Sequence, residues 1–199
     1  MKVQVEKSFL SSLKRLARYN TVWYKIYSFF RYDLIRFIKN VIKFRKALWS
    51  HYWFDHHGVL RFVEIGLTDI ANTVEFKGQE IDLSRLKKVA KMRRAIELIK
   101  NYNDDRYIEM AEAELGELML HDWEFEEAED HPGSYRIVDK ETPEEKIHNK
   151  NVFNRAREIE ELEWIELMQI LKGQDYSLFD KERDFDEQFD GSGIKGWWD

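Results

Sequence analysis

The fold is decided by residues 31–57, RYDLIRFIKNVIKFRKALWSHYWFDHH, where apolar and basic residues repeat with the period of an α-helix. At about 100° per residue, one side collects the large apolar side chains and the other side collects cations. The apolar set is Leu34, Ile38, Val41, Ile42, Leu48, Trp49 and Tyr52, and the basic set is Arg36, Lys39, Lys43 and Lys46. The pattern predicts an amphipathic helix that breaks near His57 and Gly58.

Three further cations fall inside the apolar stripe of this predicted helix. Arg31, Arg45 and His56 project within about 40° of the centre of the stripe on ideal helix geometry. Because burying an uncompensated charge costs several kcal/mol, such residues are either paired with carboxylates or line a cavity that holds an anion. The sequence leaves both interpretations open, and the functional question depends on the choice between them.

The composition is typical of a folded, mainly helical chain. Hydrophobic residues make up 43% of the 199 residues, and there are only two prolines and nine glycines. The sequence contains no cysteine, which excludes disulfides, thiolate metal sites and a cysteine nucleophile. No apolar run is long enough for the core of a signal peptide or for a transmembrane helix, so we expect a cytoplasmic protein.

Charge is distributed unevenly along the chain. Residues 1–100 carry 21 lysines and arginines against 9 aspartates and glutamates, whereas residues 101–199 carry 11 against 29. The two halves should attract each other, and a basic half of this kind also indicates an anionic partner. Thirteen of the 29 aromatic residues fall between Tyr19 and Phe54, where they would either stack against a nucleotide or form core.

Helical spacing continues on both sides of the central stretch. It predicts helices at residues 7–30, 59–76, 83–101 and 104–121. The last two should form an antiparallel hairpin, because a basic helix is followed after a short polar turn by an acidic one. The 7–30 segment is basic and amphipathic, and we expect it to pack on the domain rather than on a membrane, since other helices are present to cover it.

The remaining elements are predicted from turn and cap signals. Alternating residues around a Pro-Gly turn in residues 123–138 predict a small β-hairpin, with a plain loop as the alternative. Thr142-Pro143-Glu144-Glu145 has the pattern of a capping box, which predicts a helix that stops at Gly173. Glu163 and Glu166 of this helix are the candidates to pair with the core-facing arginines.

Together these elements predict an all-α bundle of five to six helices, with a small β-hairpin insertion and an acidic C-terminal tail. We expect the bundle domain to comprise residues 1–173. Residues 174–199 mix aspartates, glycines and aromatic residues without periodicity, so we expect them to form a separate docking tail.

Two segments, RFIKNVIKFRKALWSHYWFDHHGVLRFVEIGL and SRLKKVAKMRRAIELIKNYNDDRYIEMAEAELGEL, together with the terminal GWWD, resemble a family of small proteins that recur in tailed-bacteriophage genomes. The likeness covers about two thirds of the chain. It implies a phage origin and therefore the host cytoplasm, but it supplies no catalytic motif. Small non-structural phage proteins often interfere with host defence, so the resemblance makes an anti-defence activity the expectation.

The leading hypothesis is a non-enzymatic protein that sequesters a small anionic, nucleotide-type ligand, such as an immune signal of the host, without a cofactor. Arginines would bind the phosphate in bidentate geometry, and aromatic rings would stack on the base. The expected ligand-binding residues are Arg31, Arg45, Trp49, Tyr52, Trp53, His56 and Arg93. The competing interpretation pairs Arg45 and Arg93 internally with Glu163, Glu166 or Glu97.

Two other classes of function stay open. A protein-interaction inhibitor would mimic nucleic acid through the acidic C-terminal half and occupy a basic cleft of a host protein. A metal-dependent enzyme would use carboxylates or histidines that are similar to those of two all-α families. Glu114, Glu117, Glu160, Glu163 and Glu166 resemble the acidic motifs of MazG-type pyrophosphatases, and His51, Asp55, His56, His57, His121 and Asp122 those of HD phosphohydrolases.

Neither enzyme motif is complete, so we expect no metal site and no catalytic residues. Direct binding of nucleic acid by residues 1–100 and pairing of two copies through the aromatic surface are also compatible with the sequence.

Overall fold

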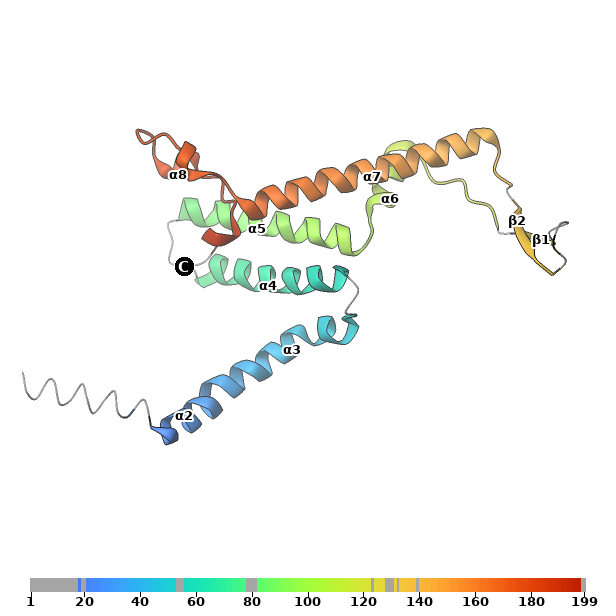
Figure 1. The fold of residues 1–199 in the computed structure, drawn as a ribbon. Helices are drawn as coiled ribbons and strands as arrows, with labels where there is room; N and C mark the ends of the chain where they lie inside the picture. The colour runs from blue at the N-terminus through green and yellow to red at the C-terminus, as the bar shows by residue number, and fades with distance from the viewer. Residues whose placement is uncertain are drawn as a thin grey trace, which may run out of the picture. The chain divides into compact units, whose positions relative to one another are not determined.

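A computed structural model describes residues 18, 21–52, 56–77, 82–122, 124–127, 131, 133–138 and 140–197. The chain divides into two compact units, Met1–Phe54 and Asp55–Asp199. The prediction of a mainly helical chain with a small antiparallel hairpin is confirmed (Figure 1). No helix within the described ranges has both the length and the apolar character needed to cross a membrane.

The first unit contains one continuous helical run. It consists of α2 (Val22–Ser28), a π-helical turn (Phe29–Asp33) and α3 (Leu34–Ser50). The run ends where His51 adopts an extended conformation, with ψ at 119°. Of the helix predicted at residues 7–30, the part before Val22 lies almost entirely outside the described residues.

The helix break therefore comes earlier than the predicted site at His57 and Gly58. Both residues lie inside α4 (His56–Lys77), the first helix of the second unit. A single glycine costs a helix only about 1 kcal/mol, and the buried residues Leu67, Ala71 and Val74 of α4 outweigh that cost.

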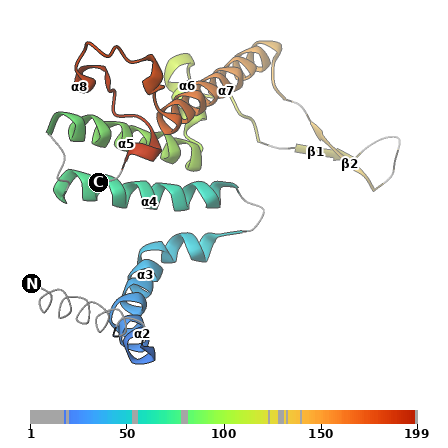
Figure 2. The same ribbon diagram turned by 60° about the vertical axis from the view of Figure 1, so that its left-hand side comes forward.

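Three long helices build the second unit. Helix α5 (Asp82–Asn103) lies between α4 and α7 (Pro143–Lys172), as both ribbon views show (Figures 1 and 2). The core that they share contains Leu67, Ala71, Val74, Val89, Met92, Ala95, Ile96, Leu98, Ile99, Leu167 and Ile170. This core explains the apolar periodicity of all three segments in the sequence.

Helix α6 (Tyr107–Leu115) is shorter than the helix predicted at residues 104–121. It stops at Gly116, whose φ of 105° lies in the left-handed region that favours glycine. Tyr107 and Ala111 of α6 pack on Val152 and Ala156 of α7 in a second, smaller core. The predicted pairing of a basic helix with an acidic one is thus replaced by packing of α6 on α7.

The hairpin and the cap of α7 follow the predictions. Strands β1 (Glu124–Glu127) and β2 (Tyr135–Val138) pair antiparallel, with Phe125 opposite Ile137. Thr142 caps α7 through a reciprocal pair of hydrogen bonds with Glu145, so the capping box is confirmed. The helix ends at Lys172, directly before Gly173, as the sequence predicts.

Residues 174–197 belong to the second unit, although their composition predicts a separate tail. They form the short helices Tyr176–Leu178, Phe185–Gln188 (α8) and Ile194–Gly196. Trp197 is only 1% exposed and joins the core between the long helices. Its indole N–H donates a hydrogen bond to the carbonyl of Gly191 at 2.7 Å.

Candidate functional site

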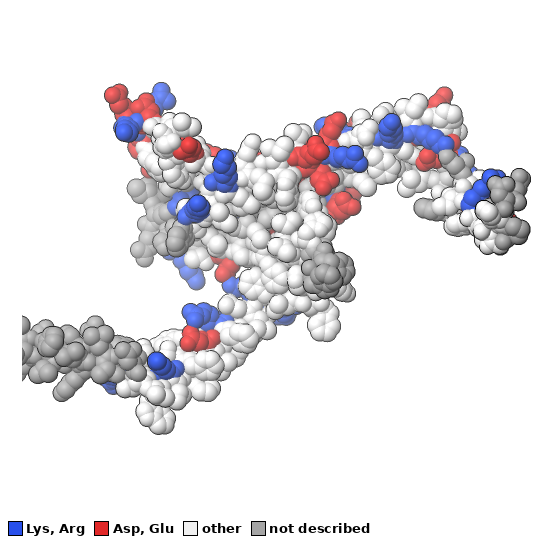
Figure 3. All heavy atoms as spheres, viewed as in Figure 1, with Lys and Arg blue, Asp and Glu red and all other residues white. Residues whose placement is uncertain are grey.

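The first candidate site is the helical run of residues 22–50, which we call the basic aromatic helix. Most of its large apolar side chains are exposed, and Trp23 and Trp49 reach 81% and 93% exposure. The others are Val22, Ile26, Tyr27, Phe29, Phe30, Tyr32, Ile35, Phe37, Ile38, Val41, Ile42 and Leu48. Residues 21–52 contain seven lysines and arginines against a single acidic residue, Asp33. Figure 3 shows blue cations among the white atoms of this helix.

The π-helical turn sets the register of the apolar face. The N–H of Leu34 donates to the carbonyl of Phe29, five residues earlier, so the turn holds about one residue more than an α-helical turn. This extra residue rotates the preceding segment by about 100° relative to a uniform α-helix. On that corrected projection, Val22, Ile26 and Phe29 join the apolar side of α3. One apolar face therefore follows the whole helix, over about 43 Å at 1.5 Å per residue.

Arg31 lies inside the π turn, so the uniform projection that placed it in the apolar stripe does not apply to it. Its guanidinium lies over the rings of Tyr27 and Tyr32, at 5.9 and 5.8 Å from their centroids. These cation–π contacts hold the side chain beside two rings without neutralising its charge. Arg31 and Arg45 are fourteen residues apart, or about 21 Å along the axis, so one small ligand would not contact both.

Arg45 and Trp49 do come together. They line an open hollow of about 460 Å³ with Lys46 and Ser50. The one carboxylate of residues 21–52, that of Asp33, lies twelve residues before Arg45 and pairs with Arg36. The hydroxyl of Ser50 donates to the carbonyl of Lys46 at 3.0 Å, so its proton is already used. The hollow thus offers two cations and one exposed indole ring, which is a combination suited to phosphate and a flat ring system.

Lys46 was not among the predicted ligand residues. Its sequence signal is its spacing, three residues before Trp49, which places the two side chains on neighbouring positions of a helix. The helical projection of the sequence placed Lys46 on the basic side of the helix. Its long aliphatic stem nevertheless reaches from that side to the hollow beside Trp49.

The other predicted ligand residues lie elsewhere. Tyr52 follows the helix and is 62% exposed, and Trp53 lies outside the described residues. His56 begins α4 in the second unit, where its Nε2 is hydrogen-bonded to the hydroxyl of Tyr102 at 2.9 Å. The structure therefore assembles part of the predicted set, Arg45 and Trp49, in one hollow.

Arg93 is paired internally. Its guanidinium donates to Glu75 at 2.7 Å and to the side-chain oxygen of Asn72 at 2.6 Å, both on α4. Glu75 lies nineteen residues after His56, so Arg93 and His56 are about 28 Å apart along α4. For Arg93 the structure supports the internal-pairing interpretation, although the partner is Glu75 and not one of the three predicted glutamates.

The predicted glutamates of α7 bind the neighbouring arginine instead. Arg94 forms a bidentate pair with Glu166, at 2.9 and 2.7 Å. This hydrogen bonding lowers the pKa of Glu166 below its usual value of 4.5. Glu163 accepts hydrogen bonds from the side-chain amide of Asn101 at 3.1 and 3.2 Å. Both carboxylates thus join α5 to α7, and the expectation that one of them pairs with Arg93 is wrong.

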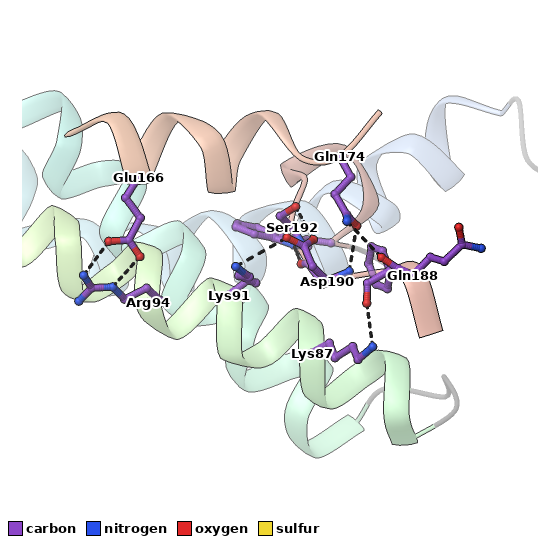
Figure 4. A network of polar contacts seen from close by, with 11 residues as sticks. Lys87, Lys91, Arg94, Glu166, Gln174, Gln188, Asp190 and Ser192 are labelled. Carbon is purple, nitrogen blue, oxygen red and sulfur yellow. Dashed lines mark hydrogen bonds and ion pairs between the residues drawn. The ribbon is translucent and has the colours of Figure 1, made fainter. Parts of the chain in front are cut away.

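A polar network fixes the C-terminal segment on α5 (Figure 4). Lys87 donates to the carbonyls of Asp186 and Phe189 at 2.7 and 2.9 Å. Asp190 accepts from the hydroxyl of Ser192 at 2.6 Å and lies 3.7 Å from the ammonium of Lys91. Part of the acidic charge in this segment is therefore used internally.

A second hollow lies between α5 and α7. It measures about 380 Å³ and is lined by Tyr102, Arg157, Glu160, Glu161, Trp164 and Ile165. The rings of Tyr102 and Trp164 are 5.3 Å apart at an angle of 39°. Burial, and then the negative charge of Glu160, raise the pKa of Tyr102. The lining has two carboxylates against one guanidinium, that of Arg157, and two aromatic rings. This acidic hollow therefore favours a cationic group, whereas the hollow at Arg45 favours an anion. Sequence spacing could not reveal it, because its rings come from different helices.

The enzyme motifs are not assembled among the described residues. Nowhere in those ranges do three or more histidine, aspartate or glutamate side chains meet in a metal-binding arrangement. Glu114 pairs with Arg155 at 2.6 Å, and His121 lies 3.2 Å from Glu145 of the capping box. These side chains thus have structural partners.

Comparisons with protein-family models, with curated proteins and with solved structures found no match to this chain. The functional proposal therefore rests on the geometry of the two hollows and of the basic aromatic helix.

Proposed function

We propose that this protein is a non-enzymatic binding protein that captures an anionic ligand on the basic aromatic helix. A nucleotide-type ligand is the first candidate: its phosphate would lie between Arg45 and Lys46, and its base would stack on Trp49. The observation that carries the proposal is the hollow at Arg45, where a guanidinium without a carboxylate partner among the described residues adjoins an exposed indole.

A titration with cyclic nucleotides and ADP-ribose, followed by calorimetry and thermal shift, tests this proposal. We expect Arg45→Gln to weaken binding about tenfold or more, because a charge-assisted hydrogen bond to phosphate is lost. We expect a loss of about fivefold or more for Trp49→Ala, because the stacking surface is removed.

Arg36→Gln is the matched control on the same helix. Arg36 already pairs with Asp33 at 2.6 Å and lies on the basic side, so its removal should leave the affinity nearly unchanged. Equal effects of Arg36→Gln and Arg45→Gln would mean that general charge, and not the hollow, attracts the ligand. If no compound of the panel stabilises the protein, a nucleotide-type ligand is ruled out.

The acidic hollow favours a second candidate function, a protein-interaction inhibitor. Tyr102, Trp164, Glu160 and Glu161 would accept an arginine or lysine side chain of a basic host protein. A labelled oligoarginine peptide tests this: Glu160→Gln with Glu161→Gln should abolish its binding, whereas Glu109→Gln, an exposed glutamate of α6, should not. Binding that is the same in both variants would contradict this role for the hollow.

A further inference from the structure

We propose that the basic aromatic helix lies on the surface of a membrane that contains anionic phospholipids. The inference rests on the proposed function, since the captured anion is then the phosphate of a lipid headgroup. It departs from the sequence-based expectation of no membrane contact, and from the expectation that residues 7–30 pack on the domain because other helices are present to cover them.

The first reason is the continuous apolar face. Ile35, Ile38 and Ile42 are exposed to 47%, 47% and 54%, and Phe30 and Phe37 to 60% and 63%. A free nucleotide in the hollow at Arg45 would leave nearly all of this surface in water. Exposed apolar patches of such length mark interaction surfaces, and the acyl boundary of a bilayer can cover an apolar face of about 43 Å.

The second reason is where the cations lie. Arg36, Lys39, Lys43 and Lys46 occupy an arc of about 80° on α3, beside the apolar arc. This places basic groups at the level of the headgroups when the apolar face enters the acyl boundary. Arg45 stands within the apolar arc, and its long side chain would reach back to a lipid phosphate, as arginine does at membrane interfaces.

The third reason is the contrast between the two units. Residues 1–54 carry 12 lysines and arginines against 2 acidic residues, and residues 55–199 carry 20 against 36. A negatively charged surface therefore attracts only the first unit and repels the second. The net charge therefore favours the helix of the first unit as the contact element. Helix α5 is also basic, but its Lys87, Arg93 and Arg94 are bound to groups of the second unit.

Other occupants fit the face less well. A second copy packed helix to helix would bring two sets of seven cations together, which is unfavourable in water. The phosphates of a nucleic acid would pair with the cations, and its bases would stack on the rings. It offers no apolar surface, however, for the aliphatic residues of α3. A bilayer with anionic lipids offers both an apolar layer and a layer of phosphates in the required order.

Flotation of the full-length protein with vesicles tests the inference. The vesicles contain either phosphatidylcholine alone or phosphatidylcholine with phosphatidylglycerol. Leu48→Glu introduces a charge into the apolar face, and Leu162→Glu makes the same change at an exposed leucine of α7. We expect the wild type and Leu162→Glu to float with the anionic vesicles, and Leu48→Glu to lose about tenfold or more of its partitioning.

A charge series completes the test. Lys39→Gln and Lys46→Gln should each reduce partitioning about fivefold at low salt, whereas Lys150→Gln on α7 should have little effect. Circular dichroism of each variant checks that it remains folded.

Three outcomes would overturn the inference: no flotation of the wild type with anionic vesicles, equal flotation of Leu48→Glu and Leu162→Glu, or a salt-dependent complex with duplex DNA in place of flotation. A dimer that Leu48→Glu abolishes, without flotation, would assign the face to a second copy. The nucleotide titration separates this inference from the proposed function. Nucleotide binding without flotation refutes only the membrane surface, and flotation without nucleotide binding refutes only the nucleotide.

Discussion

At the scale of single residues, Trp197 shows how the C-terminal segment is held. It is the largest fully buried side chain among the described residues, and its N–H is satisfied by Gly191. We expect Trp197→Ala to lower the free energy of unfolding by about 3–5 kcal/mol, because it leaves a large cavity between the long helices. Urea denaturation measures this effect. Trp23→Ala, at a residue that is 81% exposed, is the matched control and should change stability little.

Gly191 is required by a close approach of two backbones. Its φ is +87°, and a Cβ there would overlap the carbonyl of Lys87 on α5. Gly133 has a similar φ of +86°, but a Cβ there would meet no atom within 4 Å. We expect Gly133→Ala to lower the free energy of unfolding by about 1–2 kcal/mol, through backbone strain alone. Gly191→Ala should lower it by about 1–3 kcal/mol more, because of the overlap with Lys87. Equal losses in denaturant unfolding would show that the contact with Lys87 is unimportant.

At the scale of elements, the cap of α7 is a local feature with a measurable contribution. Thr142 accepts a hydrogen bond from the N–H of Glu145 at 3.2 Å, and Glu145 accepts from the N–H of Thr142 at 2.8 Å. We expect Thr142→Ala to destabilise the protein by about 1 kcal/mol, with Thr142→Ser close to the wild type. Thermal unfolding of the two variants checks this, and a loss in the serine variant as large as in alanine would contradict the capping role.

The sequence predicted those elements whose signals are local. The capping box of α7 and the stop at Gly173 depend on neighbouring residues, and apolar periodicity identified α4 and α5. The π turn at Phe29–Asp33 was not predicted, because one additional residue in a turn leaves no mark in composition or periodicity. The short α6 was missed for a different reason: the left-handed conformation of Gly116 ends a helix whose apolar pattern continues beyond it.

At the scale of the whole molecule, stability should depend on carboxylates that are ion-paired in the folded state. The hydrogen bond from Arg94 holds the pKa of Glu166 below its usual value, so the folded protein binds this proton less readily than the unfolded chain does. The stabilisation is complete above the usual pKa of 4.5 and is lost as the pH falls through the lower, folded value. Glu114 beside Arg155 acts in the same direction, because its pKa is also lowered.

We therefore expect the Tm to fall as the pH decreases below about 4.5, and Arg94→Gln to make this fall shallower. Thermal unfolding between about pH 7 and about pH 3 measures the effect. Arg157→Gln, at another arginine of the second unit with no ion pair among the described residues, is the control. If both variants show the wild-type pH dependence, the pair of Arg94 with Glu166 does not contribute to it.

The sequence could predict only those parts of the candidate site whose residues lie on a single helix. Arg45 and Trp49 are four residues apart on α3, so helix geometry alone brings them together. Arg93 meets Glu75 because of the register of α4 against α5, and the hollow at Tyr102 and Trp164 depends on the packing of α5 on α7. Neither register is encoded in residue spacing. The charge difference between the two units, in contrast, is visible in the sequence. It supports the proposal that the first unit binds an anion and the second unit a cationic group.

Hydrogen–deuterium exchange of the full-length protein tests most directly whether the basic aromatic helix is the surface that binds an anionic partner. ADP-ribose and phosphatidylglycerol vesicles are added separately. We expect at least one of them to slow exchange in peptides from residues 22–50 and to leave exchange in α5 and α7 unchanged. Unchanged exchange in residues 22–50 with both additions, or slower exchange confined to α5 and α7, would contradict it.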